Sequence, residues 1–410
     1  MSDANPTTAD VAAQASSNSD ASPAWVTDPG RMAEHERWLM ELTGTPTAAG
    51  HEDRVIAWIE AWAADHGAEL HPDPHGNLRL VRRGHAPAAE PAAEQADRLR
   101  PLIFQAHLDH PAFVVEDRAD DGSLDLTFRG GVRDPYFAGT RIVVITPAGD
   151  RHGAKVTASE ALEPLRRGRA ELDDPSIDVP PGSIAVWDLP APAIDDGILR
   201  APAVDDLAGV AAALAAFDVI GRRDVARPVE VFLTRAEEVG FVGTTAACRD
   251  RTLPSDAEIV TLETSRSFAD SPIGGGPIVR VGDRVSSFDI GLTAVASEVG
   301  KALAKEHADF AWQRKLMAGG ACEATVYVRC GYAATCLCLP LGNYHNMSEL
   351  DRIEAESPDT ATIDSEFIAV SDYHGLVRML VGIAEHPPGD DPVMKMIDRR
   401  FEQVGWILGR

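Results

Sequence analysis

Residues 101–110 read PLIFQAHLDH, an apolar run that ends abruptly in polar and charged residues. Such a run predicts a buried strand with His107 and Asp109 at its C-terminal end. The same pattern recurs three times further along the chain: VEVFLT is followed by Glu237 and Glu238, EIVTLE ends in Glu263, and TCLCLPL is followed by His345. Residues that could carry chemistry therefore gather at the ends of predicted strands.

Helical patterns alternate with these strands. Val55, Trp58, Ile59 and Trp62 recur at helical spacing behind the turn signal TAAGHED, and a long apolar helical pattern opens at AVDDLAGV. Further helical patterns lie near residues 286–308 and 364–385. Strands that alternate with helices predict an α/β fold in which helices cover both faces of a mixed sheet.

Residues 112–200 have a different character, because short β-type runs such as FVVED and GTRIVVITPAGD are separated by Gly, Asp and Pro clusters. They predict a small β-rich domain that interrupts the sheet domain. The expected organisation is a disordered tail over 1–27, a discontinuous main domain over 28–111 and 201–410, and the inserted domain between its two parts.

The composition excludes several classes of protein. The formal net charge is −26, which argues against nucleic acid or an anionic membrane surface as a partner. The apolar runs are all too short to predict a membrane-spanning helix, and the first 27 residues lack the features of a signal peptide, so we expect a cytoplasmic protein. The five cysteines show no paired spacing typical of disulfide frameworks or zinc ribbons.

The polar residues at the strand ends form a candidate metal site. In an open α/β sheet the ligand crevice lies outside the carboxyl ends of the strands, and Asp205 and Asp206, which open a helix, can join that rim. Two histidines with several carboxylates suit zinc or a neighbouring divalent metal, and more than four candidate ligands suggest two metals. Taken singly, each of these residues could equally be a surface side chain or a helix cap.

The order of the motifs AHLD, AVDD, EEVG, LET and NYHNM resembles the M42 family of co-catalytic metallo-aminopeptidases, of the tetrahedral or glutamyl-aminopeptidase type, within the M20/M28/M42 clan. TAAGHED and HGNLRLV are similar to N-terminal segments of that family. Spacing separates the relatives: Asp205 follows His107 by 98 positions, and His345 follows Glu263 by 82 positions. Only the M42 arrangement places a β-rich domain between the first His and the Asp pair.

The resemblance implies a zinc-exopeptidase fold, two divalent ions (zinc, with cobalt or manganese as alternatives) and a role for each residue. Glu237 would be the general base, Asp109 would orient the first imidazole, and the Asp205–Asp206 peptide bond would be cis. Asp205 would bridge both metals, and the remaining ligands, one or two to each metal, would be His107, Glu238, Glu263 and His345.

This sequence departs from the family pattern at four positions. His110 stands where the family usually has Glu, Leu207 where it has Arg, Glu263 where Asp is more frequent, and Glu323 where a GGTDA-like turn would carry Asp. The candidate ligand set survives these changes. The loss of an Arg beside the site changes which charged groups of a substrate can be accommodated there, so the sequence leaves the identity of the substrate open.

Three functions fit the sequence. The first is an aminopeptidase that releases N-terminal residues from short peptides by attack of a metal-bound hydroxide. The second is an M20-like deacylase of N-acyl amino acids or small amides, and the third is a metal-binding scaffold without activity. Glu237 favours catalysis, because a scaffold needs no free carboxylate beside its metals. Relatives form homo-oligomers, and the apolar tail after Pro387 and Pro388 could pack between subunits or fold back on its own domain.

Overall fold

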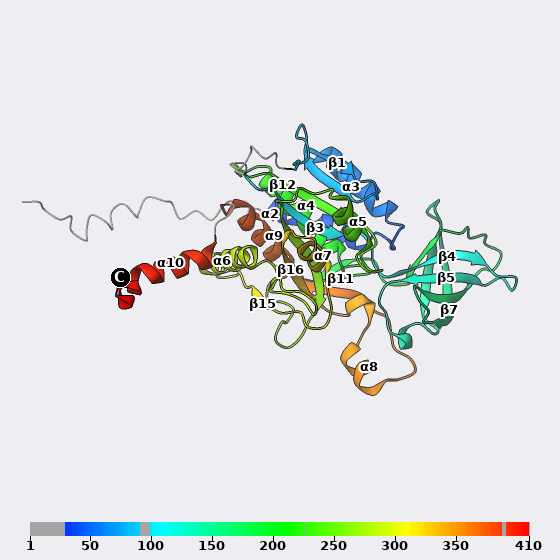
Figure 1. Ribbon diagram of the computed structural model, residues 1–410. Helices are drawn as coiled ribbons and strands as arrows, with labels where there is room; N and C mark the ends of the chain where they lie inside the picture. Colours follow the sequence, from blue (N-terminus) through cyan, green and yellow to red (C-terminus); the bar gives the residue numbers. More distant parts are fainter. Residues whose placement is uncertain (1–28, 91–98, 226, 388–390, 410) are drawn as a thin grey trace, which may run out of the picture.

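The structure is a computed structural model that describes residues 29–90, 99–225, 227–387 and 391–409 (Figure 1). The N-terminal tail expected over 1–27 lies outside the described residues. Among the helices of the described ranges, none combines the length and apolar character needed to cross a membrane.

The centre of the fold is a mixed sheet of eight strands in the order β1-β2-β12-β3-β13-β16-β14-β15. The four strands in the middle, β12, β3, β13 and β16, run parallel to one another, so their carboxyl ends meet at one edge. The flanking pairs β1–β2, β2–β12 and β14–β16 are antiparallel. The strands span β1 (Ala68–Pro72), β2 (Leu78–Arg82), β3 (Leu102–His107), β12 (Val229–Thr234), β13 (Glu258–Arg266), β14 (Ile278–Arg280), β15 (Gln313–Lys315) and β16 (Ala333–Leu341).

Helices cover both faces of this sheet because its central strands are apolar on both sides. In β3, Phe104 packs with the cluster on the side of α4 and α9, whereas its neighbour Ile103 packs with the cluster on the side of α5 and α7. Helix α4 is buried along its whole length, and its many alanines let it lie close to the sheet and to other helices. The α/β sandwich predicted from the sequence is confirmed. Its helices are α2 (Pro29–Thr43), α3 (Asp53–Asp65), α4 (Leu207–Ile220), α5 (Val242–Asp250), α6 (Ile290–Glu306), α7 (Glu323–Arg329) and α9 (Val370–Glu385).

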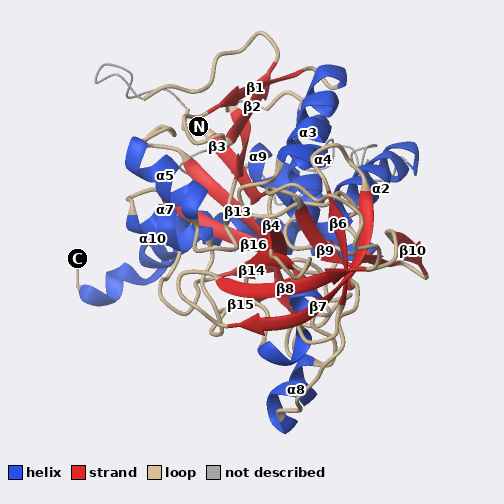
Figure 2. Cartoon of the chain, turned by 90° about the vertical axis from the view of Figure 1, so that its right-hand side faces the viewer, coloured by secondary structure: helices blue, strands red, loops and turns tan. Residues whose placement is uncertain are grey.

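The β-rich segment forms a closed barrel in the strand order β4-β5-β8-β7-β6-β9, which stands beside the sandwich in Figure 1 and faces the viewer in Figure 2. Its core is aromatic: Phe113, Phe128, Phe137 and Trp187 pack ring against ring, with centroids 4.8 Å apart for Phe113 and Phe128. The strands span β4 (Ala112–Arg118), β5 (Leu124–Arg129), β6 (Arg141–Ile145), β7 (Arg151–Glu160), β8 (Arg166–Leu172) and β9 (Ile184–Trp187), and a 3-10 turn, η2 (Asp134–Tyr136), lies between β5 and β6.

The boundary between barrel and sandwich is less simple than a single insertion. Strands β10 (Ala193–Asp195) and β11 (Ile198–Ala201), which the sequence places in the β-rich segment, form a separate three-stranded sheet in which β11 pairs with β17 (Glu366–Ala369) from the C-terminal part. Conversely, Leu350 and Ile353 of α8 (Leu350–Glu356) pack into the barrel core. We therefore propose a barrel domain that begins at residue 112, ends near 187 and receives α8 from the second part of the chain.

The chain ends in a helix that leaves the body of the molecule, as Figures 1 and 2 both show. Helix α10 (Pro392–Val404) is capped by Asp391, and a 3-10 turn, η4 (Gly405–Leu408), follows it. It touches α6, but none of its residues is buried, and Phe401 and Trp406 are 62% and 70% exposed. The helix thus contacts its own domain through α6 and leaves its apolar side chains exposed.

Candidate active site

The parallel strands bring the predicted residues to one edge of the sheet. His107 is the last residue of β3, and Glu263 lies in the second half of β13. Glu237 and Glu238 follow β12. The other two come from loops: Asp205 precedes α4, and His345 lies in the 3-10 turn η3 (Tyr344–Asn346) after β16.

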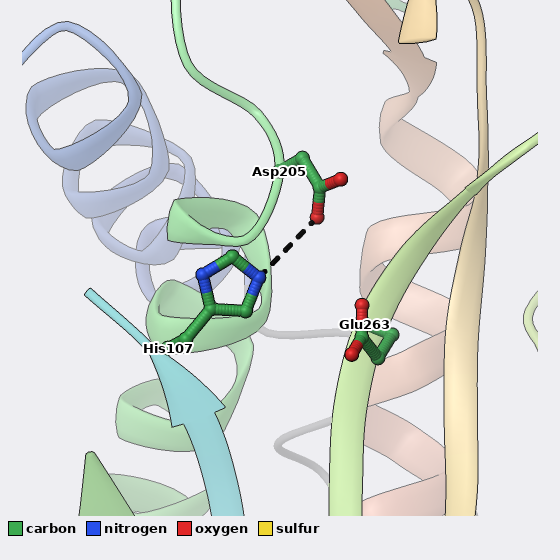
Figure 3. Close-up of side chains that lie close together, drawn as sticks. All are labelled: His107, Asp205 and Glu263. Atoms are coloured by element: carbon green, nitrogen blue, oxygen red, sulfur yellow. Dashed lines mark ion pairs between the residues drawn. The ribbon is translucent and has the colours of Figure 1, made fainter. Parts of the chain in front are cut away.

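These side chains form three overlapping groups of possible metal ligands: two share Asp205, and the third consists of His107, Glu237 and Glu238. His107, Asp205 and Glu263 point toward a common space, with their candidate ligand atoms within 4.8 Å of one another (Figure 3). Asp205, Glu238 and His345 form a second group of the same size. Asp205 lies between them: its Oδ1 is 3.6 Å from Nε2 of His107, and its Oδ2 is 3.4 Å from Nε2 of His345.

Both imidazoles turn the same nitrogen toward this space. Nδ1 of His107 lies 3.1 Å from the carbonyl oxygen of Asp109, and Nδ1 of His345 lies 2.7 Å from the carbonyl oxygen of Gly131 in the barrel domain. Because a carbonyl only accepts hydrogen bonds, each Nδ1 carries a proton, which leaves Nε2 as the nitrogen that can bind a metal.

The donor set fits divalent cations. Asp205 Oδ1, Glu238 Oε1 and Glu263 Oε1 are buried and have no hydrogen-bond partner among the described residues, which is unusual for buried carboxylate oxygens. Burial, followed by the charge of Glu237, raises the pKa of Glu263 well above its usual range. Bound cations would satisfy these oxygens and neutralise the closely spaced negative charges.

The charges of the site also shift the pKa values of His107 and of Glu237, the expected general base. Burial lowers the pKa of His107, but Glu237, Asp109 and Asp205 outweigh burial and raise it well above the usual value. Burial raises the pKa of Glu237, and the neighbouring Glu238 raises it further. Oε2 of Glu237 lies 4.0 Å from Nε2 of His107, and its side chain remains 12% exposed. A carboxylate with a raised pKa at the open side of a metal site is suited to accept a proton.

Asp109 differs from the expectation in how it acts. Its carbonyl oxygen accepts the hydrogen bond from His107, whereas its carboxylate oxygen is 3.7 Å from that Nδ1. The carboxylate instead accepts hydrogen bonds from the backbone amides of Glu237 at 2.9 Å and Glu238 at 3.0 Å. Asp109 thus holds the loop of two neighbouring glutamates with its side chain and the histidine with its main chain.

The backbone of these loops adopts uncommon conformations. The Asp205–Asp206 peptide bond is cis, as expected from the resemblance. Ala236, Asn343, His345 and Asn346 all have positive φ although none is glycine. Positive φ in residues other than glycine persists only where the surroundings hold it, and it is concentrated at functional sites.

Two buried glutamates near the site have no role in the sequence-based scheme. Glu52 accepts hydrogen bonds from the backbone amide of Ala236 and the guanidinium of Arg235, so it supports the loop that leads to Glu237. Glu52 lies in the TAAGHED segment, whose similarity to the family could have indicated this residue. Glu366 contacts the loops of Asp205 and His345, and no pattern in the sequence indicates this.

Three of the residues that depart from the family pattern, His110, Leu207 and Glu323, are buried near the site. His110 is buried, and its Nδ1 donates to the carbonyl oxygen of Asp205 at 2.6 Å. Leu207 is the first residue of α4 and is fully buried, so this position adds no charge to the site. Glu323 is also fully buried and accepts hydrogen bonds from Thr234, Thr244 and Gln105.

A comparison with known protein families decides the relationship. The family model described as M42 glutamyl aminopeptidase matches residues 92–357. The chain belongs to the M42 family. As an M42 member it is a peptide hydrolase, and the resemblance read from its motifs is confirmed.

Solved structures of M42-type aminopeptidases share the fold. The TET1 peptidase of Pyrococcus horikoshii is 20% identical, with a TM-score of 0.66 over 86% of this chain and 99% of that one. An aminopeptidase of the archaeon Desulfurococcus kamchatkensis is 18% identical, with a TM-score of 0.67 over 87% and 96% of the two chains. A TET aminopeptidase of a marine sediment archaeon of the Thaumarchaeota is 17% identical, with a TM-score of 0.68 over 86% of this chain and 97% of that one. The fold is therefore that of these enzymes at low sequence identity.

Proposed function

We propose that this M42 peptidase is a di-metal aminopeptidase that removes N-terminal residues from short peptides. The observation that carries the proposal is the place of Asp205, which presents one carboxylate oxygen to His107 and the other to His345. A carboxylate shared in this way is the arrangement that holds two metals about 3.5–4 Å apart.

The proposed ligands divide between two ions, zinc with cobalt or manganese as alternatives. Asp205 would contact both, His107 and Glu263 would complete one site, and Glu238 and His345 would complete the other. When bound, the ions polarise the substrate carbonyl and lower the pKa of a water molecule.

The remaining chemistry belongs to the protein side chains. Glu237 accepts the proton of the attacking water at its carboxylate and returns it to the amino group that leaves. Burial raises the pKa of Glu237, which favours the step in which its carboxylate binds the proton. Asp109 keeps Glu237 and Glu238 in place through their backbone amides, so that one can bind metal while the other stays free.

We also propose that the chain forms a homo-oligomer. The TET1 peptidase of P. horikoshii can assemble into a tetrahedron or a large octahedral shell, and the solved structure of PhTET1-12s contains a dodecamer in the asymmetric unit. The exposed apolar side chains of α10 support a contact between subunits in this chain too, because surfaces of this kind are seldom left open to water.

Mass-spectrometric analysis of a mixed peptide library tests the activity. The library contains each peptide with a free and with an acetylated N-terminus, and the protein is reconstituted with zinc or cobalt. We expect removal of single N-terminal residues from the free-amine peptides only, and Glu237→Gln as the control should leave both sets intact. Cleavage confined to the acetylated set would point to the deacylase and overturn the proposal.

A further inference from the structure

Asp205 and His345 lie in separate loops, and one buried carboxylate contacts the backbone of both. Glu366, the first residue of β17, has an exposed fraction of 0%. Its Oε2 accepts hydrogen bonds from the amides of Val204 at 2.7 Å and Asp205 at 3.0 Å. Its Oε1 accepts a hydrogen bond from the amide of His345 at 2.8 Å. Three backbone donors from two loops therefore meet on one side chain.

The strand that carries Glu366 also pairs with the segments on either side of it. Glu366 is in register with Ala201 of β11, the strand that leads into the Asp205 loop. The next residue, Phe367, exchanges two backbone hydrogen bonds with Gly342, which precedes the His345 turn. Strand β17 thus lies between the two loops, and its first side chain reaches the residues that carry the proposed ligands.

His110 adds a second tie between the same loops. Its Nδ1 donates to the carbonyl oxygen of Asp205 at 2.6 Å, and its Nε2 lies 3.0 Å from Oδ1 of Asn346. The amide and the carbonyl of Asp205 are consequently both engaged by buried side chains. This agrees with the site's geometry, because the carboxylate of Asp205 can serve two histidines only if its main chain is fixed.

We propose that Glu366 is a positioning residue that sets the distance between Asp205 and His345, and so shapes the metal site that these two share with Glu238. The inference rests on the proposed function, since it concerns the metals assigned there. Oδ2 of Asp205 and Nε2 of His345 are 3.4 Å apart, and metal–ligand distances tolerate deviations of only about 0.2 Å. A small shift of either loop would therefore weaken this site.

The other site depends less on Glu366. His107 and Glu263 are part of strands β3 and β13, so the hydrogen bonds of the central sheet already fix their positions. We therefore expect a substitution at Glu366 to act unequally on the two metals. A side chain with a merely structural role would lower stability without singling out one ion.

Glu366→Gln is the sharpest test, because glutamine keeps the size of the side chain but offers only one acceptor oxygen. Its amide group would face an N–H donor of one of the two loops instead of accepting from it. The matched control is Glu230→Gln. Glu230 is also buried and accepts hydrogen bonds from Arg79 and from the amide of Ala88, but it contacts none of the proposed ligands.

The measurement is a titration of the full-length, chelator-stripped proteins with Zn²⁺ against a chromophoric competitor, beside thermal unfolding of the same samples. We expect the wild type and Glu230→Gln to bind two ions with the same affinities. Glu366→Gln should keep one ion and bind the second 10- to 100-fold more weakly, the effect typical of lost support for a ligand. Excess Zn²⁺ should restore its occupancy, which would not follow if the variant were unfolded.

Unchanged affinity for both ions in Glu366→Gln would overturn the inference, as would an equal loss in Glu230→Gln. A wild-type protein that binds fewer than two ions would overturn the proposed function itself, which is a different result. If Glu366→Gln does not fold, Glu366→Asp serves in its place. The shorter carboxylate cannot reach all three amides, and the same selective loss of one ion is expected.

Discussion

The sheet sandwich and the barrel differ in what they contribute to the site. The sandwich supplies every proposed metal ligand and the proposed base, all from one edge of its central strands. The barrel supplies one carbonyl oxygen, that of Gly131, which accepts the hydrogen bond from His345. One unit carries the chemistry and the other supports a single ligand.

Topology explains this difference. Four neighbouring parallel strands leave a row of carboxyl ends at one edge, where loops from distant parts of the chain meet. The barrel strands are antiparallel and closed into a ring, so their ends alternate between two rims and create no such edge. The aromatic core of the barrel stabilises that domain and holds its loops in place.

The largest effect is expected from the residue that joins both groups in the sandwich. Asp205→Ala removes the carboxylate from both proposed metal sites, so metal content measured by mass spectrometry should fall from two ions per chain toward zero. Activity should fall by more than the roughly 10²- to 10⁴-fold expected from losing a general base alone. Retention of two ions would contradict the shared role of Asp205.

Glu237→Gln should lower kcat by about 10²- to 10⁴-fold, because the amide cannot accept the proton of water. Both ions should remain bound, since Glu237 is not among the proposed ligands. Steady-state kinetics together with metal analysis of the same sample checks this. Activity equal to the wild type would remove Glu237 from the mechanism.

In the barrel, Phe128→Ala should destabilise the aromatic core by about 3–5 kcal/mol. Phe128 contacts Phe113 and Phe137 and is buried, so its removal leaves a cavity. Hydrogen exchange should rise in barrel strands while α4 and the central strands stay protected. The site should keep its ions but lose some activity through the Gly131 contact. Equal loss of protection in both units would show that they unfold together.

A smaller effect concerns acid stability of the sandwich. Burial alone raises the pKa of Asp218 in α4, but His35, Arg31 and Arg222 outweigh it and lower the pKa to about 2. A pKa lowered by folding stabilises the protein above the unfolded value near 3.9, and this contribution is lost as the pH falls through about 2. Because its partner Arg222 is largely exposed and solvent screens that charge, we expect only about 1–2 kcal/mol.

Asp218→Asn should remove that contribution. Its unfolding free energy should lie below that of the wild type at pH 6, and the two should converge as the pH falls from about 4 toward 2. Chemical denaturation at several pH values measures the difference. A gap that stays constant over this range would show that the charge of Asp218 is not its cause.

Much of the architecture could be predicted from local pattern. The apolar runs that end in His107, before Glu237 and at Glu263 predicted the central strands, and periodicity predicted the helices around them. The pairing of β11 with β17, a strand far along the chain, could not be predicted from the sequence, because long-range pairing leaves no local signal. The same holds for α8, whose apolar residues pack against the barrel.

The sequence by itself determined the family, the α/β class and the residue types at the strand ends, because periodicity and motif order are local properties. Only the tertiary structure decided that the carboxylate of Asp109 holds two glutamate amides and that Glu366 joins two loops. Those contacts depend on where backbone N–H and C=O groups end up once distant segments pack together, and the residue types do not encode that position.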